Sequence, residues 1–275
     1  MKIISYASGG LGNRILPLAS CHDMAKKTGR SLAINWEPSK WCDIRFENLF
    51  SNSIEQIDIK KLDPSSTVLY ADYQNVVNEY TTYTGRKELF DLASIVGCKP
   101  LNTIENIKHE KADNIVVYWC DLLPPFVEIH DFFKELTLVK SIEDILNEFI
   151  ENNSLDKTVY GIHARGTDFS TSLEQYDIFI EKAMNENKNS RFFLCSDEKE
   201  WEFELKKKYG DKLIIRNNKH FVQKQTHSNN WINNVIRDKN SVIDSVIDMM
   251  LLSKTTLLIS HQQSSFAKCA KYFGT

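Results

Sequence analysis

The second half of the chain alternates apolar runs of strand length with longer amphipathic segments, and this pattern constrains the fold most. In chain order it predicts a strand at 159–164, a helix from about 173, a strand at 191–195, a helix at 198–209, a strand at 213–215, a helix at 241–253, a strand at 257–260 and a helix at 264–273. Consecutive parallel strands need a long crossover, which a helix supplies. The alternation therefore predicts a parallel α/β domain, and the polar turn at 151–154 places it at 155–275.

The amino-terminal part is typical of a strand–helix–strand unit. Its predicted elements are a strand, a glycine-rich turn, a helix and a second strand, at 2–6, 8–13, 15–28 and 31–35. Two further strands are predicted, at 67–71 and 115–119. We therefore expect a first Rossmann-like domain at 1–154. With the second domain, it would form an α/β architecture in which two Rossmann-like parallel domains face a cleft.

Composition and charge exclude several classes of protein. With 42% hydrophobic residues among 275, the chain is too apolar to be disordered. Its 34 Lys and Arg against 37 Asp and Glu give a net charge of −3, which disfavours sequence-independent binding of nucleic acid. No apolar run reaches the roughly 20 residues of a membrane span or the length of a signal peptide. We expect a cytoplasmic protein, either free in solution or peripheral to a membrane.

The sequence shows no metal-binding pattern. Its six cysteines include no Cys-x-x-Cys pair, its histidines are scattered, and no Asp-x-Asp occurs. Zinc sites and carboxylate pairs that hold a divalent cation on a diphosphate would need such spacings. We therefore expect reduced, packed cysteines and a site that requires neither a metal nor another cofactor.

The first candidate binding segment is the glycine-rich turn after the first strand. Glycine lets backbone N–H groups approach an anionic or hydroxyl-rich ligand. The candidate contacts in this turn are Gly10, Gly12, Asn13 and Arg14. A dinucleotide fingerprint would need glycine where Ile15 stands, and no Gly-Lys-Ser/Thr of a P-loop is present. The alternative is that the glycines only form a tight turn.

The second candidate segment ends the strand that opens the second domain. His163 and Arg165 lie two residues apart, and therefore on one face of the strand, with Asp168 in the following loop. Arg165 suits a diphosphate, because a guanidinium engages two oxygens and stays charged. Asp168 would orient it or contact a sugar hydroxyl. The alternative is a surface salt bridge at a strand end.

Three later positions carry polar residues in similar places. Ser196 and Asp197 follow a strand and would contact a ligand or cap the next helix. Asp248 lies among apolar residues of a helix, so it needs a hydrogen-bonding partner, for which the N–H edge of guanine is suitable. Ser264 and Ser265 open the last helix, where hydroxyls and backbone N–H groups bind an anion or cap the helix.

In their order along the chain, these segments resemble the fucosyltransferases of the α1,2, the α1,6 nodulation-type and the protein O-fucosylating groups. The resemblance rests on Gly-Gly-Leu-Gly-Asn after the first strand, His-x-Arg-x-x-Asp at 163–168, and Ser-Ser-Phe at 264–266 after an Asp-bearing helix. It implies a GT-B fold, a GDP-sugar donor, no metal requirement and inversion at the sugar carbon. Many relatives carry a second Arg where this chain has Gly166, and the bacterial α1,2 enzymes carry Gln where it has Arg14.

The resemblance also implies residue roles. Arg165 would hold the donor β-phosphate and help the leaving group. The other implied donor contacts are His163 and Asp248 at the nucleoside, Ser264 and Ser265 at the phosphates or sugar, and Asn13 and Arg14 from the other domain. The candidates for a general base that activates the acceptor hydroxyl are Asp168, Glu174, Asp72 and Asp121.

We therefore expect an inverting glycosyltransferase that moves L-fucose from GDP-fucose to a hydroxyl of a glycan in a surface polysaccharide or glycoprotein. One alternative is the same fold and reaction with a UDP-hexose or a UDP-pentose such as UDP-xylose. Another is a nucleotide-binding module without turnover. An NAD-dependent oxidoreductase is disfavoured by the incomplete glycine fingerprint. The expected partners are a nucleotide sugar and a glycan acceptor, and not nucleic acid.

Overall fold

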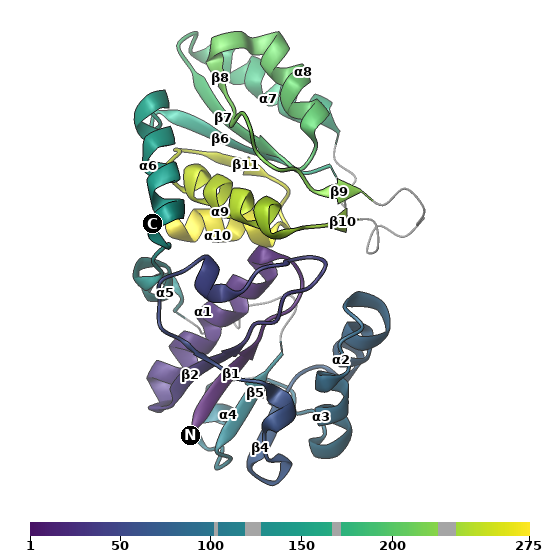
Figure 1. Ribbon diagram of the computed structural model, residues 1–275. Coiled ribbons are helices and arrows are strands. Elements are labelled where there is room, and N and C mark those ends of the chain that lie inside the picture. Colours follow the sequence, from purple (N-terminus) through teal and green to yellow (C-terminus); the bar gives the residue numbers. More distant parts are fainter. Residues whose placement is uncertain (102–103, 119–127, 167–171, 225–234) are drawn as a thin grey trace. The chain divides into compact units, whose positions relative to one another are not determined.

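Two compact units make up the chain, Met1–Thr137 and Leu138–Thr275. The computed structural model describes residues 1–101, 104–118, 128–166, 172–224 and 235–275. Each unit holds one parallel sheet (Figure 1), which confirms the predicted α/β class. Helix α6 (Lys140–Asn153), which the sequence analysis placed in the first domain, falls in the second unit. Its Phe149 packs edge-on against Phe193 of the second sheet, with ring centroids 5.9 Å apart.

The first unit is built on a five-stranded parallel sheet in the order β3-β2-β1-β5-β4. Its strands are β1 (Lys2–Tyr6), β2 (Ser31–Asn35), β3 (Glu55–Gln56), β4 (Thr67–Tyr70) and β5 (Asn114–Val117). In register, Ile4 of β1 lies opposite Ala33 of β2 and Val116 of β5. The predicted strands at 2–6 and 31–35 are confirmed with the same bounds.

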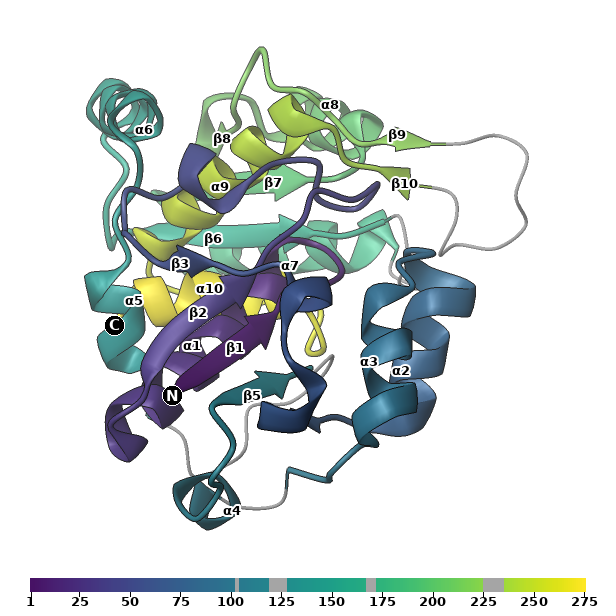
Figure 2. The same ribbon diagram turned by 60° about the horizontal axis from the view of Figure 1, so that its bottom comes forward.

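The helices of the first unit are α1 (Leu11–Thr28), α2 (Tyr73–Asn78), α3 (Glu88–Val96), α4 (Ile104–Lys108) and α5 (His130–Glu135). Short 3-10 turns lie at Phe46–Asn48, Ile59–Lys61 and Pro64–Ser66, and a π-helical turn lies at Glu79–Tyr83. Helices α2 and α3 lie side by side (Figure 2). Both follow polar stretches, and the sequence analysis did not predict them.

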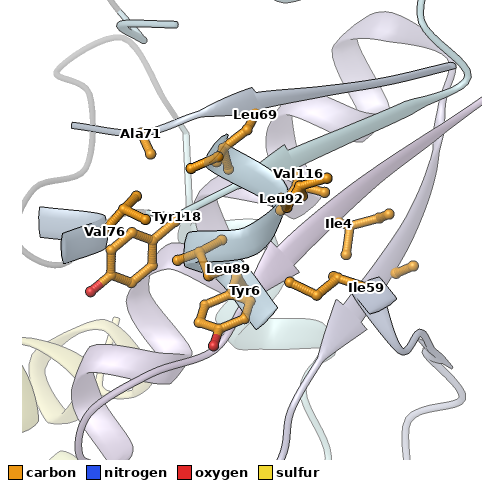
Figure 3. Close-up of a cluster of buried hydrophobic side chains, with 12 residues drawn as sticks. Ile4, Tyr6, Ile59, Leu69, Ala71, Val76, Leu89, Leu92, Val116 and Tyr118 are labelled. Atoms are coloured by element: carbon orange, nitrogen blue, oxygen red, sulfur yellow. The ribbon is translucent and has the colours of Figure 1, made fainter. Parts of the chain in front are cut away.

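Apolar side chains cover both faces of the first sheet. Ile4 and Tyr6 point to the face on which Leu89 of α3 packs (Figure 3). Ile3, which directly precedes Ile4, belongs to the opposite cluster with Met24 of α1. Because successive strand residues point to opposite faces, burial of both sets means that helices cover the sheet on both sides. In such sheets, ligands bind at the carboxyl edge of the strands.

The second unit has a four-stranded parallel sheet in the order β11-β6-β7-β8. These strands are β6 (Val159–Ala164), β7 (Arg191–Ser196), β8 (Leu213–Ile214) and β11 (Leu258–Ser260). The helices after α6 are α7 (Leu173–Glu186), α8 (Lys199–Tyr209), α9 (Lys239–Ser253) and α10 (Ser265–Phe273), and a 3-10 turn lies at Gly210–Lys212. The four strands and four helices predicted between residues 159 and 273 are observed in the predicted order.

A short antiparallel pair, β9 (Gln223–Lys224) and β10 (Val235–Ile236), lies outside the main sheet of this unit. Helix α6 packs against α9, and α9 packs against α10. The helices in the described part of the chain are too short or too polar to cross a lipid bilayer.

Candidate functional site

The loops after β6 and β7 meet at the carboxyl edge of the second sheet. Parallel pairing sets Ala164 opposite Ser196, so the residues that follow each strand are neighbours. The backbone N–H of Gly166 donates to Asp197 Oδ1 at 2.8 Å and ties the two loops together. The Ser196 hydroxyl accepts a hydrogen bond from the Glu198 N–H at 3.0 Å. The structure thus brings Ser196 and Asp197 to the end of β6.

A glycine is required at position 166 by its surroundings. A Cβ added there would lie 2.6 Å from Glu198 Cγ and 2.9 Å from Trp201 Cη2. These separations are far below contact distance, so any larger residue would displace α8 or its side chains. An arginine at position 166 would therefore require Glu198 and Trp201 to move.

His163 is held between the strand end and the start of the last helix. It is buried, and its ring stacks on Phe266 with centroids 4.6 Å apart and planes 28° from parallel. Its Nδ1 lies 3.5 Å from the Ser264 hydroxyl oxygen. Ser264 is also buried and caps α10 by accepting a hydrogen bond from the Ala267 N–H at 3.2 Å. Ser265 is the first residue of that helix and is half-buried.

Arg165 leaves the end of β6 and is half-buried, with its backbone N–H 3.4 Å from Tyr176 Oη. Asp168 and Asp121, two of the candidate general bases, lie outside the described residues. Glu174 is exposed in the first turn of α7. Asp72 lies in the first unit and caps α2, accepting the Asn75 N–H at 3.0 Å.

Asp248 has two cationic partners inside the protein. Arg216 Nη1 donates to its Oδ1 at 3.0 Å, and Lys219 Nζ donates to its Oδ2 at 3.0 Å. All three side chains are at most 9% exposed. A partly buried Asp248 that needs a partner is predicted from the sequence, but the two cations after β8 that supply it are not.

Lys219 extends this network to the end of β7. It also donates to Glu202 and to the Ser196 carbonyl oxygen, the latter at 3.2 Å. Glu202 in turn accepts the Ser196 N–H at 2.7 Å. Burial raises the pKa of Glu202 to about 7, against the lowering effect of Lys219. Both backbone groups of Ser196 are therefore fixed by buried charged side chains at the carboxyl edge of the second sheet.

Asp244 forms the outer part of the same network. It accepts from Arg216, from the His220 N–H at 2.8 Å, and lies 2.9 Å from His220 Nδ1. Burial opposes ionisation of Asp244, but the hydrogen bonds from His220 and the charge of Arg216 together lower its pKa. The segment 216–220 is thus fastened to α9 at both ends.

In the first unit, Arg14 supports the glycine-rich turn from inside. Its three guanidinium nitrogens donate to the Gly9 and Glu37 carbonyl oxygens and to Ser39 Oγ at 2.8–2.9 Å. It is fully buried, and burial lowers its pKa. Its guanidinium carbon lies 5.1 Å from the centre of the Trp36 ring. These contacts favour a structural role for Arg14 in shaping the turn.

The predicted turn at 8–13 is shorter in the structure, because α1 begins at Leu11 and not at about Ile15, so Gly12 and Asn13 lie in its first turn. Gly9 has φ +72°, a conformation that favours glycine, and α1 begins directly after Gly10. Gly12 is buried in the first turn of α1, and Asn13 is half-buried there.

A second buried cluster at the carboxyl edge of the first sheet escaped the sequence analysis. Glu79 is wholly buried in the π-helical turn and has no arginine or lysine partner among the described ion pairs. The hydroxyls of Ser8, Tyr118 and Thr84 donate to its carboxylate at 2.6, 3.0 and 2.9 Å. Ser8 follows β1 and Tyr118 follows β5, so Glu79 joins the ends of two strands. The most distant of these partners from Glu79 in the sequence is Ser8, 71 residues away.

No group of three His, Cys, Asp or Glu side chains within the described ranges is placed to hold a metal ion. Five cysteines in those ranges are free thiols, at positions 21, 42, 98, 195 and 269. Burial raises the pKa of Cys195 and of Cys269.

Known structures share this fold over nearly the whole chain. A NodZ α-1,6-fucosyltransferase co-crystallised with GDP is 19% identical, with a TM-score of 0.66 over 98% of this chain and 91% of that one. NodZ from Bradyrhizobium, in a selenomethionine form, gives 0.65 at 19% identity over the same shares. POFUT1 in complex with GDP-fucose gives 0.60 at 14% identity, over 99% of this chain and 93% of that one.

No protein-family model and no curated protein sequence matches the chain. The likeness therefore lies in three-dimensional structure, at identities too low to carry activity or substrate with it. The predicted resemblance to the fucosyltransferases is confirmed at the level of the fold: the chain has the GT-B fold of NodZ and POFUT1.

Proposed function

We propose that the protein is an inverting, metal-independent glycosyltransferase that moves L-fucose from GDP-fucose to a hydroxyl of a glycan. One observation carries the proposal. His163, Arg165, Asp197 and Ser264 gather at the carboxyl edge of β6 in a chain whose fold is that of NodZ, crystallised with GDP, and of POFUT1, crystallised with GDP-fucose. The acceptor proposed is a glycan of a surface polysaccharide or glycoprotein.

The donor diphosphate is proposed to lie between Arg165 and the start of α10. The guanidinium of Arg165 supplies fixed positive charge, and the first backbone N–H groups of α10, together with Ser265, add hydrogen-bond donors with the positive end of the helix dipole. Phe266, which is half-buried and stacked on the buried His163, offers the flat surface that a nucleoside would contact. Asp197 holds the Gly166 turn in place.

The reaction proposed is a single displacement at the sugar carbon. As the bond to the diphosphate oxygen breaks, positive charge develops on the sugar ring and negative charge on the leaving phosphate. Arg165 stabilises that negative charge without a divalent cation. An acceptor hydroxyl attacks from the opposite face, giving inversion, and loses its proton to a general base. Asp168, Glu174, Asp72 and Asp121 stay as candidates for that base.

A second candidate donor is favoured by the ion pairs of Asp248. Arg216 and Lys219 occupy both carboxylate oxygens, so guanine would have to share or displace one of these cations. A donor whose base makes no contact with Asp248, such as a UDP-pentose or UDP-hexose, would leave the network intact. A nucleotide-binding module without turnover is the third possibility.

Arg165→Ala separates turnover from binding. We expect GDP release from GDP-fucose to fall at least a hundredfold while GDP still raises the thermal stability of the variant. The matched control is Arg191→Lys, at the opposite end of the second sheet, which should change neither property. Unchanged GDP release in Arg165→Ala would refute the proposed role of Arg165. A wild-type protein that GDP stabilises but that releases no GDP from GDP-fucose would favour the binding module.

Asp248→Asn tests the choice of base. The amide keeps the shape of the side chain but presents one donor where guanine requires an acceptor. Loss of GDP stabilisation together with retained folding supports a guanine nucleotide. Unchanged GDP binding favours the donors whose base does not contact Asp248.

A further inference from the structure

The second unit contains a groove that the proposed donor site does not use. It has a volume of about 620 Å³ and lies between α6, the segment after β8, and the first half of α9. All of its lining residues belong to the second unit, and helices α6 and α9 form its two sides. It includes neither His163 nor Arg165 nor the start of α10.

The lining of the groove combines apolar side chains with carboxamides. Phe149, Ile243 and the 46% exposed Ile145 present carbon surface. Around them, Asn152, Asn217, Asn218 and Asn240 all have exposed side chains. Each carboxamide carries a donor and an acceptor side by side. A ligand with alternating hydroxyls and C–H faces would match this surface.

The charges of the groove disfavour an anionic ligand. Its arginine, Arg216, is already bound by the carboxylates of Asp244 and Asp248. Glu148 adds a negative charge on the α6 side. A phosphate or sulfate would therefore compete with two carboxylates for Arg216, whereas a neutral, hydroxyl-rich molecule would leave the ion pairs in place.

Hydrogen bonds fix the backbone segment 216–220, which carries Asn217 and Asn218. Asn218 has φ +61°, the left-handed conformation that asparagine tolerates better than most residues. Arg216 donates to the Asp244 carbonyl oxygen at 2.9 Å, and the His220 N–H donates to the Asp244 carboxylate. These bonds hold 216–220 against α9 from both ends, so Asn217 and Asn218 are presented without the entropy cost of ordering a loose loop.

We propose that this groove is a carbohydrate-binding site for a neutral oligosaccharide. Sugar hydroxyls pair with the carboxamides of Asn217, Asn218 and Asn240, and the C–H face of a ring packs on Phe149 and Ile243. The site goes beyond the proposed transfer reaction, because binding in it needs neither a nucleotide nor turnover.

The test is binding of the whole protein, without nucleotide, to an array of neutral and charged oligosaccharides of defined structure. A bound oligosaccharide is then titrated into the double variant Asn217→Ala/Asn240→Ala and into the control Asn147→Ala, which removes an exposed amide of α6 outside the groove. We expect at least tenfold weaker binding in the double variant and unchanged binding in the control. No neutral oligosaccharide bound by the wild type, or equal affinity in all three proteins, overturns the proposal.

A second measurement keeps the test independent of how the double variant folds. In the ¹⁵N-labelled wild type, the same oligosaccharide should shift the side-chain amide signals of Asn217, Asn218 and Asn240. Shifts confined to residues at the end of β6 would overturn the groove and leave the transferase proposal standing. Shifts of the groove amides in a protein whose Tm neither GDP nor GDP-fucose raises would support the groove and contradict the transferase proposal.

Discussion

Replacing Glu202 with glutamine should remove a pH dependence that its buried carboxyl gives to the second unit. Glu202 is 3% exposed, and burial raises its pKa from 4.5 to about 7. Between these two values the folded protein binds more protons than the unfolded chain. The free energy of unfolding must therefore fall as the pH rises from about 4.5 to about 7.

The size of this effect follows from the shift in pKa. Each tenfold change in proton affinity is worth about 1.4 kcal/mol, so raising the pKa from 4.5 to about 7 costs about 3 kcal/mol once the carboxyl is ionised. Glutamine keeps an oxygen where Glu202 accepts the Ser196 N–H and carries no titrating proton. The variant should gain about 3 kcal/mol relative to wild type between pH 4.5 and pH 7.5.

Urea unfolding at a series of pH values measures this difference. Trp201, next to Glu202 on α8, contributes to the fluorescence signal. The control is Glu200→Gln, which removes an exposed carboxyl of the same helix. Its free energy of unfolding should change with pH as that of wild type does. If the free energy of unfolding of Glu202→Gln changes with pH from 4.5 to 7.5 as that of wild type does, Glu202 is not the source of the pH dependence.

Three further substitutions test the packing and the buried charges by urea unfolding. Lys219→Met leaves two buried carboxylates without their ammonium partner and should cost about 3–5 kcal/mol; a loss below about 1 kcal/mol would contradict the network. Glu79→Ala deprives three hydroxyls of their acceptor and should cost at least about 3 kcal/mol, with Glu79→Gln costing less than half as much; equal effects of the two would refute the hydrogen-bonding role. Gly166→Ala should cost roughly 1–3 kcal/mol because its Cβ meets α8, whereas Gly10→Ala, whose Cβ would lie 4.0 Å from the nearest atom, should cost less; the reverse order would contradict the packing.

Much of the fold could be predicted from hydrophobic periodicity. The strands at 2–6, 31–35 and 159–164 are apolar runs bounded by turn residues, and each is observed with the predicted bounds. Helices α2 and α3 were not predicted, because the first is short and polar and the second follows an irregular stretch. The hydrophobic pattern of these two segments is too weak to predict a helix, and their packing against the first sheet stabilises the helical form.

The candidate site was predictable where its residues follow strands, because parallel strands bring their carboxyl ends to one edge. His163, Ser196 and Asp197 could be placed by that rule alone. The partners of Asp248 could not, because Arg216 and Lys219 lie in a segment rich in Asn, His and Lys that is typical of a solvated loop. Their burial comes from tertiary packing between segments about 30 residues apart.

Buried polar clusters were the least predictable features. Glu79 is one of 37 acidic residues, and nothing near it in the sequence marks it as wholly buried. Its partners Ser8 and Tyr118 are brought to it by the pairing of β1 with β5. Arg14 likewise appears in the sequence as a ligand contact of the glycine-rich turn, whereas the structure gives each of its nitrogens a protein acceptor.

Thermal unfolding of the purified protein with GDP, GDP-fucose, UDP, UDP sugars, CMP and NAD, all in EDTA, tests the proposed function most directly. A ligand at a hundred times its Kd stabilises the folded state by about 2.7 kcal/mol, which is enough to raise Tm by several degrees. We predict that GDP and GDP-fucose alone raise Tm, and that removal of divalent cations leaves the effect intact. Stabilisation by UDP compounds instead, or by none of the nucleotides, would contradict a GDP-fucose-dependent transferase.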